Sequence, residues 1–84
     1  MLRKSDVAGV VEQEVRELLV EAFVEVEELS PDDNLVELGF NSLMLARLVA
    51  LLETSIGVDP FAEHAVISDV HTIGDLVRVY SDAL

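Results

Sequence analysis

The spacing of apolar residues restricts this chain to a small helical fold. In three separate stretches, apolar side chains return at steps of three and four residues, which is the period of one buried face of an α-helix. These stretches run from Ser5 to about Val26, from Leu43 to Ile56, and from Thr72 to the end of the chain. The sequence therefore predicts an all-α structure built from three amphipathic helices around a common core.

The apolar positions within these helices identify the expected core. The 84 residues are enough for one small core, so we expect a single domain over residues 1–84. The one tyrosine, Tyr80, is expected at the edge of this core, with its hydroxyl in water or on a backbone carbonyl. The predicted core residues are Val7, Val11, Val15, Leu18, Leu19, Ala22, Phe23, Val26, Leu45, Leu48, Val49, Leu52, Ile56, Ile73, Leu76, Val77, Tyr80 and Leu84.

Capping residues mark where helices begin and end. Gly57 suits the end of the second long helix, and Asp59-Pro60 opens a short third helix with an aspartate cap and a proline in the first turn. Thr72 and Asp75 form a variant of the capping box at the start of the last helix. The expected fold is a small four-helix bundle with three longer helices and one short third helix.

The long loop between the first two helices also carries structural signals. The run of residues 30–33, Ser-Pro-Asp-Asp, combines a serine cap, a proline and two acids, which favours a single helical turn inside the loop. Asn34 is expected to interrupt that pattern. Leu35 and Leu38 would pin the loop against the bundle, so we expect the loop to be ordered.

The charge of the chain limits its partners. Seventeen Asp and Glu against five Lys and Arg give a formal net charge of −12, which repels nucleic acid and anionic lipid and attracts basic protein surfaces. Acidity that serves solubility alone is the alternative. No apolar run approaches the length of a membrane span, and no signal-peptide core is evident. We therefore expect a cytoplasmic protein with protein partners, and no binding to nucleic acid or membrane.

The chain offers little for catalysis or metal binding. It has no cysteine, and its two histidines, His64 and His71, match none of the usual zinc spacings. A nucleophilic serine needs a histidine held against it and an acid behind the histidine, whereas both histidines are expected on the surface or in a loop. We therefore expect no catalytic residue and no metal site.

One junction between a loop and a helix, residues 37–44 (Glu-Leu-Gly-Phe-Asn-Ser-Leu-Met), is distinctive. Gly39 suits a backbone position with positive φ, and Asn41 is favoured in turns. Ser42 begins a helix, where a side-chain oxygen can meet unpaired backbone amides. Taken alone, the serine at this junction is explained by an ordinary helix cap at Ser42.

The wider run Leu35–Leu43 resembles the attachment motif of acyl and peptidyl carrier proteins. In that family a leucine-glycine turn, then Asp, Asn or His, then Ser-Leu precede the second helix, and the order of helices and the chain length also match. The resemblance implies that Ser42 carries a covalent 4′-phosphopantetheine arm taken from coenzyme A, with Asn41 and Leu43 beside it. Asn41 stands where many members have Asp, so any contribution of that carboxylate to transferase recognition is lost.

The resemblance also implies a set of partner enzymes. A phosphopantetheinyl transferase would add the arm, an adenylation enzyme or acyltransferase would load it, and a downstream synthase or condensation enzyme would take the thioester. The chain itself would be a monomeric carrier and not an enzyme. Val66 and Ile67 resemble positions that line the approach to the arm, although core packing is the commoner explanation for both.

The second long helix has an unusually apolar outer face. A solvated helix in an acidic protein normally carries Glu and Lys there, so this face predicts a protein contact. Coverage of some of these residues by the loop or the third helix is the alternative. The predicted contact residues are Leu43, Met44, Ala46, Arg47, Ala50 and Leu51.

The charges of this helix favour one branch of carriers. Glu53 is its only acid and Arg47 lies on the presumed contact side, whereas carriers of fatty acid synthesis resemble one another in a strongly acidic second helix. We therefore favour a carrier of acyl, aminoacyl or peptidyl thioesters in polyketide or nonribosomal-peptide biosynthesis. The alternative from another class is an unmodified acidic helical adaptor that binds a basic partner through Leu43, Met44 and Leu51.

Overall fold

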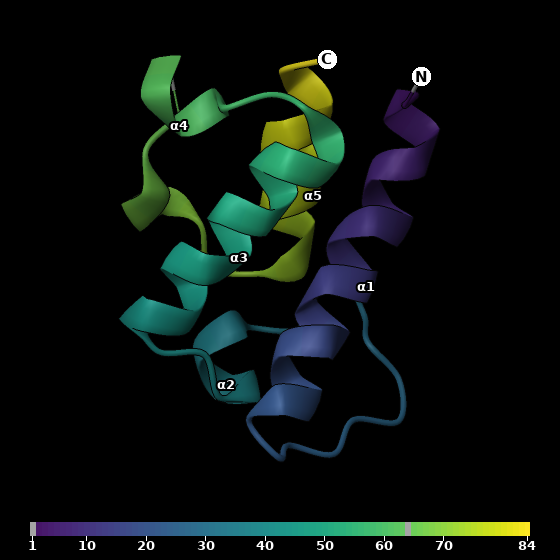
Figure 1. The fold of residues 1–84 in the computed structure, drawn as a ribbon, viewed down its shortest axis with the longest axis vertical. Helices are drawn as coiled ribbons and strands as arrows, with labels where there is room; N and C mark the ends of the chain where they lie inside the picture. Colours follow the sequence, from purple (N-terminus) through teal and green to yellow (C-terminus); the bar gives the residue numbers. More distant parts are fainter. Residues whose placement is uncertain (1, 64) are drawn as a thin grey trace.

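A computed structural model describes residues 2–63 and 65–84 (Figure 1). Helix α1 packs against both α3 and α5, and these three longer helices form the body of the molecule. The expected all-α bundle is confirmed, and α4 is its short third helix. The elements in chain order are α1 (Lys4–Glu21), α2 (Leu35–Leu38), α3 (Ser42–Ile56), α4 (Pro60–Glu63), the 3₁₀ helix η1 (Ile67–Asp69) and α5 (Ile73–Asp82).

One apolar face of each long helix forms the core, and the loops before α3 and α5 add to it. Most of the predicted core residues are buried. Four predicted core residues in α3, in α5 and at the C-terminus are less buried than expected: Leu45, Val49 and Val77 are half-buried and Leu84 is exposed. The buried apolar residues are Val7, Val11, Val15, Leu18, Leu19, Leu35, Phe40, Leu48, Leu52, Ile56, Val70, Ile73, Leu76 and Tyr80.

Tyr80 lies inside the core and not at its edge. Its side chain is fully buried, and its hydroxyl makes a long hydrogen bond of 3.5 Å to the backbone oxygen of Val49, the kind of partner that was expected. Its ring meets Phe61 of α4 edge to face, with 6.0 Å between ring centroids, which holds α4 against α5. Burial, followed by the carboxylates of Glu53 and Asp59, raises the pKa of the Tyr80 hydroxyl.

Helix α1 ends at a left-handed residue, Phe23, whose φ is +62°. The amide of Phe23 donates to the oxygen of Val20 (3.0 Å), and the amide of Val24 donates to the oxygen of Leu19 (2.9 Å). These two bonds form the Schellman arrangement of a helix end. The arrangement packs Val24 against the core and leaves Phe23 outside it.

This helix end corrects the prediction that the first helix extends to about Val26 with its apolar face buried. Ala22 and Phe23 are exposed and Val26 is half-buried in the loop. The other two left-handed helix ends carry glycine, Gly39 with φ of +115° and Gly57 with φ of +88°. Compared with glycine, a residue with a Cβ is destabilised by about 1–2 kcal/mol in this conformation. Glycine would therefore be the expected residue at position 23.

The loop between α1 and α2 is tied to the start of α5 by backbone hydrogen bonds. The amide of Leu35 donates to the oxygen of His71 (2.9 Å), and the amide of Gly74 donates to the oxygen of Pro31 (2.8 Å). A Cβ on residue 74 would lie 3.0 Å from that same proline oxygen, so the close approach of the two segments favours glycine. The loop is therefore held in place by α5, far along the sequence.

Local details of this loop differ from the prediction. Residues 30–33 form a hydrogen-bonded turn, with 3.0 Å between the first oxygen and the last amide, and not a turn of helix. Asn34 begins the additional helix α2, because its Oδ1 accepts a hydrogen bond from the amide three residues later (3.1 Å). The expected anchoring is confirmed, since Leu35 is buried and Leu38 packs half-buried against the core.

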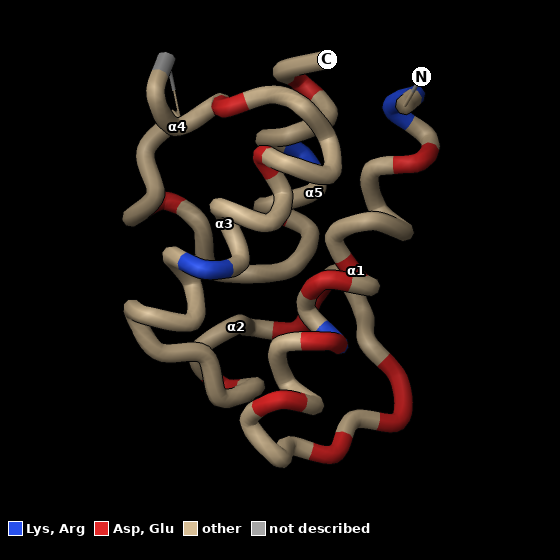
Figure 2. Tube along the Cα trace, in the orientation of Figure 1, with Lys and Arg blue, Asp and Glu red and all other residues tan. Residues whose placement is uncertain are grey.

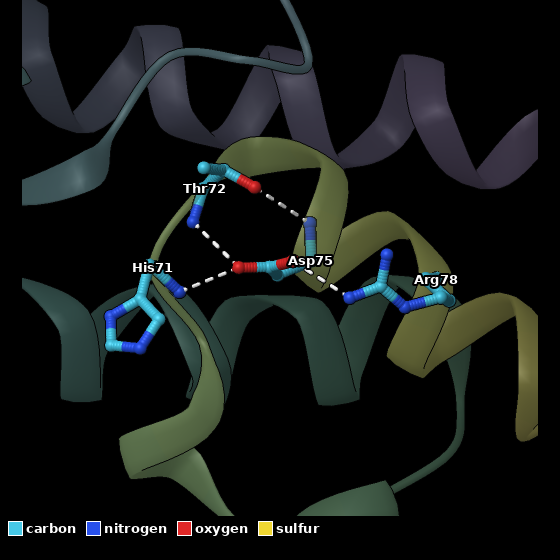
Figure 3. Close-up of polar contacts among 4 residues, drawn as sticks. All are labelled: His71, Thr72, Asp75 and Arg78. Atoms are coloured by element: carbon cyan, nitrogen blue, oxygen red, sulfur yellow. Dashed lines mark hydrogen bonds and ion pairs between the residues drawn. The ribbon is translucent and has the colours of Figure 1, made fainter.

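The carboxylate of Asp75 fixes the start of α5 (Figure 3). Its Oδ2 accepts from the amides of His71 (2.9 Å) and Thr72 (3.0 Å), and its Oδ1 accepts from the guanidinium of Arg78 (2.7 Å). The Thr72 hydroxyl accepts from the Asp75 amide (3.1 Å), which completes the predicted capping box. The two backbone amides, and then Arg78, hold the pKa of Asp75 well below its usual range.

We expect Asp75→Asn to lower the free energy of unfolding by about 1–2 kcal/mol at pH 7. Because the folded-state pKa is depressed, the carboxylate stabilises the fold above its unfolded-state pKa of about 4 and loses this contribution as the pH falls toward the folded-state value. The difference between the wild type and Asp75→Asn should therefore shrink below about pH 4. Urea unfolding followed by circular dichroism at a series of pH values measures it.

Asp32→Asn is the matched control, because Asp32 is an exposed carboxylate in the loop that packs on the same junction. Its unfolding free energy should stay within about 0.5 kcal/mol of the wild type at neutral pH. A difference for Asp75→Asn that is independent of pH would contradict the assigned role of its charge.

Candidate functional site

Ser42 is the first residue of α3, and the preceding turn determines its exposure. Helix α2 ends at Gly39, in the left-handed region, and the amide of Phe40 donates to the oxygen of Leu35 (3.0 Å). This turn directs the Phe40 side chain into the core, where it is 5% exposed, and leaves Asn41 and Ser42 on the surface. The serine hydroxyl therefore stands at a solvent-facing corner between a loop and a helix.

Asn41, and not Ser42, caps α3. Its Oδ1 accepts from the amide of Met44 (2.8 Å), and its backbone oxygen accepts from the amide of Leu45 (2.9 Å). Among residues 2–63 and 65–84, no side-chain hydrogen bond engages the Ser42 hydroxyl. An ordinary helix cap therefore does not explain this serine.

Two grooves meet at Ser42, and Leu45 lines both of them. The first has a volume of about 440 Å³ and lies between α2, the start of α3 and the segment that precedes α5. The second has a volume of about 450 Å³ and lies along α3 beside α4 and η1; it is lined by Ser42, Leu45, Ala46, Val49, Phe61 and Ile67. Both Leu45 and Val49 are half-buried because their side chains line a groove, and Leu45 also packs against the core.

The sequence did not identify all of the groove residues. The lining includes Phe40, from the turn just before Ser42, and two residues from distant segments, His71 in the first groove and Phe61 in the second. The resemblance had suggested Ile67, which does line the second groove, and Val66, which is 56% exposed and is not part of its lining. These residues lie in a turn, in a four-residue helix and in a connecting segment, which are too short to show a periodic pattern, so only their packing reveals the grooves.

The residues near Ser42 do not form a hydrolytic triad in the described part of the chain. His71 lines the first groove, but its backbone amide, and not its ring, donates to Asp75. His64 lies outside the described residues. No group of three or more His, Asp or Glu among the described residues is arranged to hold a metal ion. None of the helices that the structure describes is both long and apolar enough to cross a membrane.

The predicted contact face of α3 is largely exposed. Leu43 is 71% exposed and Leu51 is 37% exposed, and Ala46, Arg47 and Ala50 are also at the surface. Met44 differs, because its side chain is half-buried against the core. Arg47 pairs with Glu21 at the end of α1 (3.3 Å), an exposed contact that contributes little to stability.

Comparison with known families agrees with this geometry. A family model described as a phosphopantetheine attachment site matches residues 13–79, which include the second half of α1, all of α2, α3 and α4, most of α5, and the junction that carries Ser42. The fold and this match define a phosphopantetheine-binding carrier domain of the acyl and peptidyl carrier type. The chain belongs to the phosphopantetheine attachment site family, whose domains hold 4′-phosphopantetheine covalently and act as carriers for transferases and synthases. Comparisons with curated proteins and with solved structures found no match.

The assignment of the cap leads to a paired test. Asn41→Ala should lower the free energy of unfolding by about 1 kcal/mol, because the amide of Met44 loses its side-chain acceptor. Ser42→Ala should change it by less than about 0.5 kcal/mol, because the hydroxyl has no capping role and alanine favours the helix. Chemical denaturation of both variants measures the two effects, and a larger loss for Ser42→Ala would contradict the assignment.

Proposed function

We propose that Ser42 is the attachment residue for the phosphopantetheine arm. The observation that carries this proposal is an exposed serine hydroxyl at the start of α3 whose capping role is taken by Asn41. A separate transferase can reach such a hydroxyl without unfolding the bundle. The chain lacks cysteine, so the thiol of the arm is the only thiol of the loaded protein.

The local backbone suits the phosphodiester that attachment would create. Among the described residues, neither the amide of Ser42 nor that of Leu43 has a backbone or side-chain acceptor. Unpaired amides at the start of a helix favour an anion. The two amides would therefore offset part of the repulsion between the new phosphate and a chain whose net charge is −12. When bound, the arm supplies a thiol on which acyl, aminoacyl or peptidyl groups are held as thioesters.

We propose further that the chain serves polyketide or nonribosomal-peptide biosynthesis. The support is the charge of α3, which carries Glu53 as its only acid and presents Arg47 at the surface. Recognition of the loading enzyme and of the downstream synthase or condensation enzyme then depends more on apolar fit than on salt-sensitive ion pairs. The contact residues proposed for this recognition are Leu43, Met44, Ala46, Arg47, Ala50 and Leu51.

The attachment site is tested by intact mass after incubation with coenzyme A and a broad-specificity phosphopantetheinyl transferase. The wild type should gain one phosphopantetheinyl group and Ser42→Ala should gain none. Ser55→Ala is the matched control, because it removes another exposed serine of the same helix and should be modified as the wild type is. Modification of Ser42→Ala, or no modification of the wild type, would overturn the proposal, and the second result would favour the unmodified adaptor.

The proposed contact face is tested with the cognate loading enzyme. Leu43→Ser and Arg47→Glu should each lower kcat/KM for loading of the phosphopantetheinylated chain by about tenfold, the effect of losing roughly 1.4 kcal/mol of contact. Both residues are exposed, so circular dichroism and unfolding should be nearly unchanged. Leu84→Ser is the control at an exposed apolar residue outside the face. Unchanged loading by both face variants would remove this assignment.

A further inference from the structure

Phe23 occupies a position where a phenylalanine is unfavourable in two respects. Its backbone is left-handed, with φ of +62°, and its side chain is 95% exposed, the highest value among the large apolar residues described. The same chain places glycine at its two other left-handed helix ends, where no Cβ is strained. A strained and exposed aromatic residue is a feature associated with functional surfaces.

Phe23 is one of the residues that line an apolar hollow at the end of α1. The hollow has a volume of about 640 Å³, and Val20, another of its lining residues, is 65% exposed. We call it the Phe23 surface and define it by its lining residues, Val20, Phe23, Val24, Glu25, Val26 and Glu27. None of these residues lines either groove beside Ser42, so the surface is distinct from the carrier site.

The residues of the Phe23 surface and its loop carry only negative charge. Two arginines of other elements lie close by and are already paired: Arg16 donates to the backbone oxygen of Val26 (3.2 Å) and pairs with Glu12, and Arg47 pairs with Glu21. Glu25 and Glu27 line it, Glu28 is exposed next to it, and the whole loop from Ala22 to Asn34 contains no Lys or Arg. Figure 2 shows acidic segments and no basic one along the loop that follows α1. An apolar anchor with a carboxylate rim is complementary to an apolar pocket bordered by Lys or Arg.

We propose that the Phe23 surface docks a basic, amphipathic segment of a partner protein, with the Phe23 ring as the anchor. Aromatic residues are enriched among the anchors that dominate binding energy at protein interfaces. A second copy of this chain is disfavoured as the occupant, because it would bring another acidic rim and another net charge of −12. Docking does not require modification of Ser42, since the two sites share no lining residue.

The proposal is tested with a synthetic helical peptide of leucine and lysine that carries one tryptophan. The chain has no tryptophan, so peptide fluorescence reports binding directly. We expect a dissociation constant that weakens as the salt concentration rises, with amide shift changes in the ¹⁵N-labelled chain centred on residues 20–28. A leucine and glutamate peptide of the same length should bind at least tenfold more weakly.

Phe23→Gly separates docking from stability. Glycine relieves the left-handed strain, so the melting temperature should rise by several degrees while binding of the lysine peptide weakens at least tenfold. Val66→Ser is the matched control, because Val66 is another exposed apolar residue outside the hollow, and it should bind within about twofold of the wild type. Ser42→Ala should also bind as the wild type does, whatever the outcome of the phosphopantetheine test.

Three results would overturn the proposal. Equal peptide binding by Phe23→Gly would exclude the ring as the anchor. Shift changes centred on the Leu43–Leu51 face would exclude the Phe23 surface as the binding site. Equal binding of the glutamate peptide would exclude a basic partner. Self-association in sedimentation experiments that is lost in Phe23→Gly would identify a second copy of the chain as the occupant in place of a basic partner.

Discussion

The backbone pairing between residues 31–35 and the start of α5 is the constraint on which the functional end of the molecule depends. It joins a loop to a helix that follows it by some forty residues of chain, with bonds of 2.9 Å at Leu35 and 2.8 Å at Gly74. This pairing buries Leu35 and holds α2 against the core. The turn at Gly39 then leads into α3 and leaves Ser42, the first residue of that helix, exposed. Asp75 fixes the other side of the same pairing by accepting from the amides of His71 and Thr72.

Two left-handed turns determine which side chains are exposed at this end of the molecule. At Gly39 the turn buries the following Phe40 and exposes the serine, whereas at Phe23 it buries the following Val24 and exposes the aromatic ring itself. The same left-handed turn thus exposes the proposed attachment serine in one place and an apolar ring in the other. A carrier is acted on by several enzymes in turn. With two separate surfaces, a partner bound at the Phe23 surface would leave the Ser42 junction open to an enzyme.

Much of the fold and of the junction at Ser42 could be predicted from the sequence, because helical periodicity and capping chemistry depend on residues close together in the chain. The three long helices, the threonine and aspartate box at α5, the aspartate at the start of α4 and the loop anchors Leu35 and Leu38 follow from residues within a few positions of one another. The exposed serine after a glycine turn is local in the same sense. The family follows from that junction together with the order of helices, as the match over residues 13–79 confirms.

The tertiary structure alone decided where that periodicity stops and what surrounds the serine. The apolar pattern continues through Phe23 to Val26, yet α1 ends at Glu21, because the chain must turn there for the loop to reach α5. The capping role of Asn41 depends on the exact backbone of the turn, and the grooves at Ser42 depend on Phe40, Phe61 and His71 converging from separate elements. The sequence by itself determined the helices and the junction that carries Ser42, since those signals act over a few residues. The end of α1 and the surfaces beside it were decided by contacts between distant segments, which no local pattern encodes.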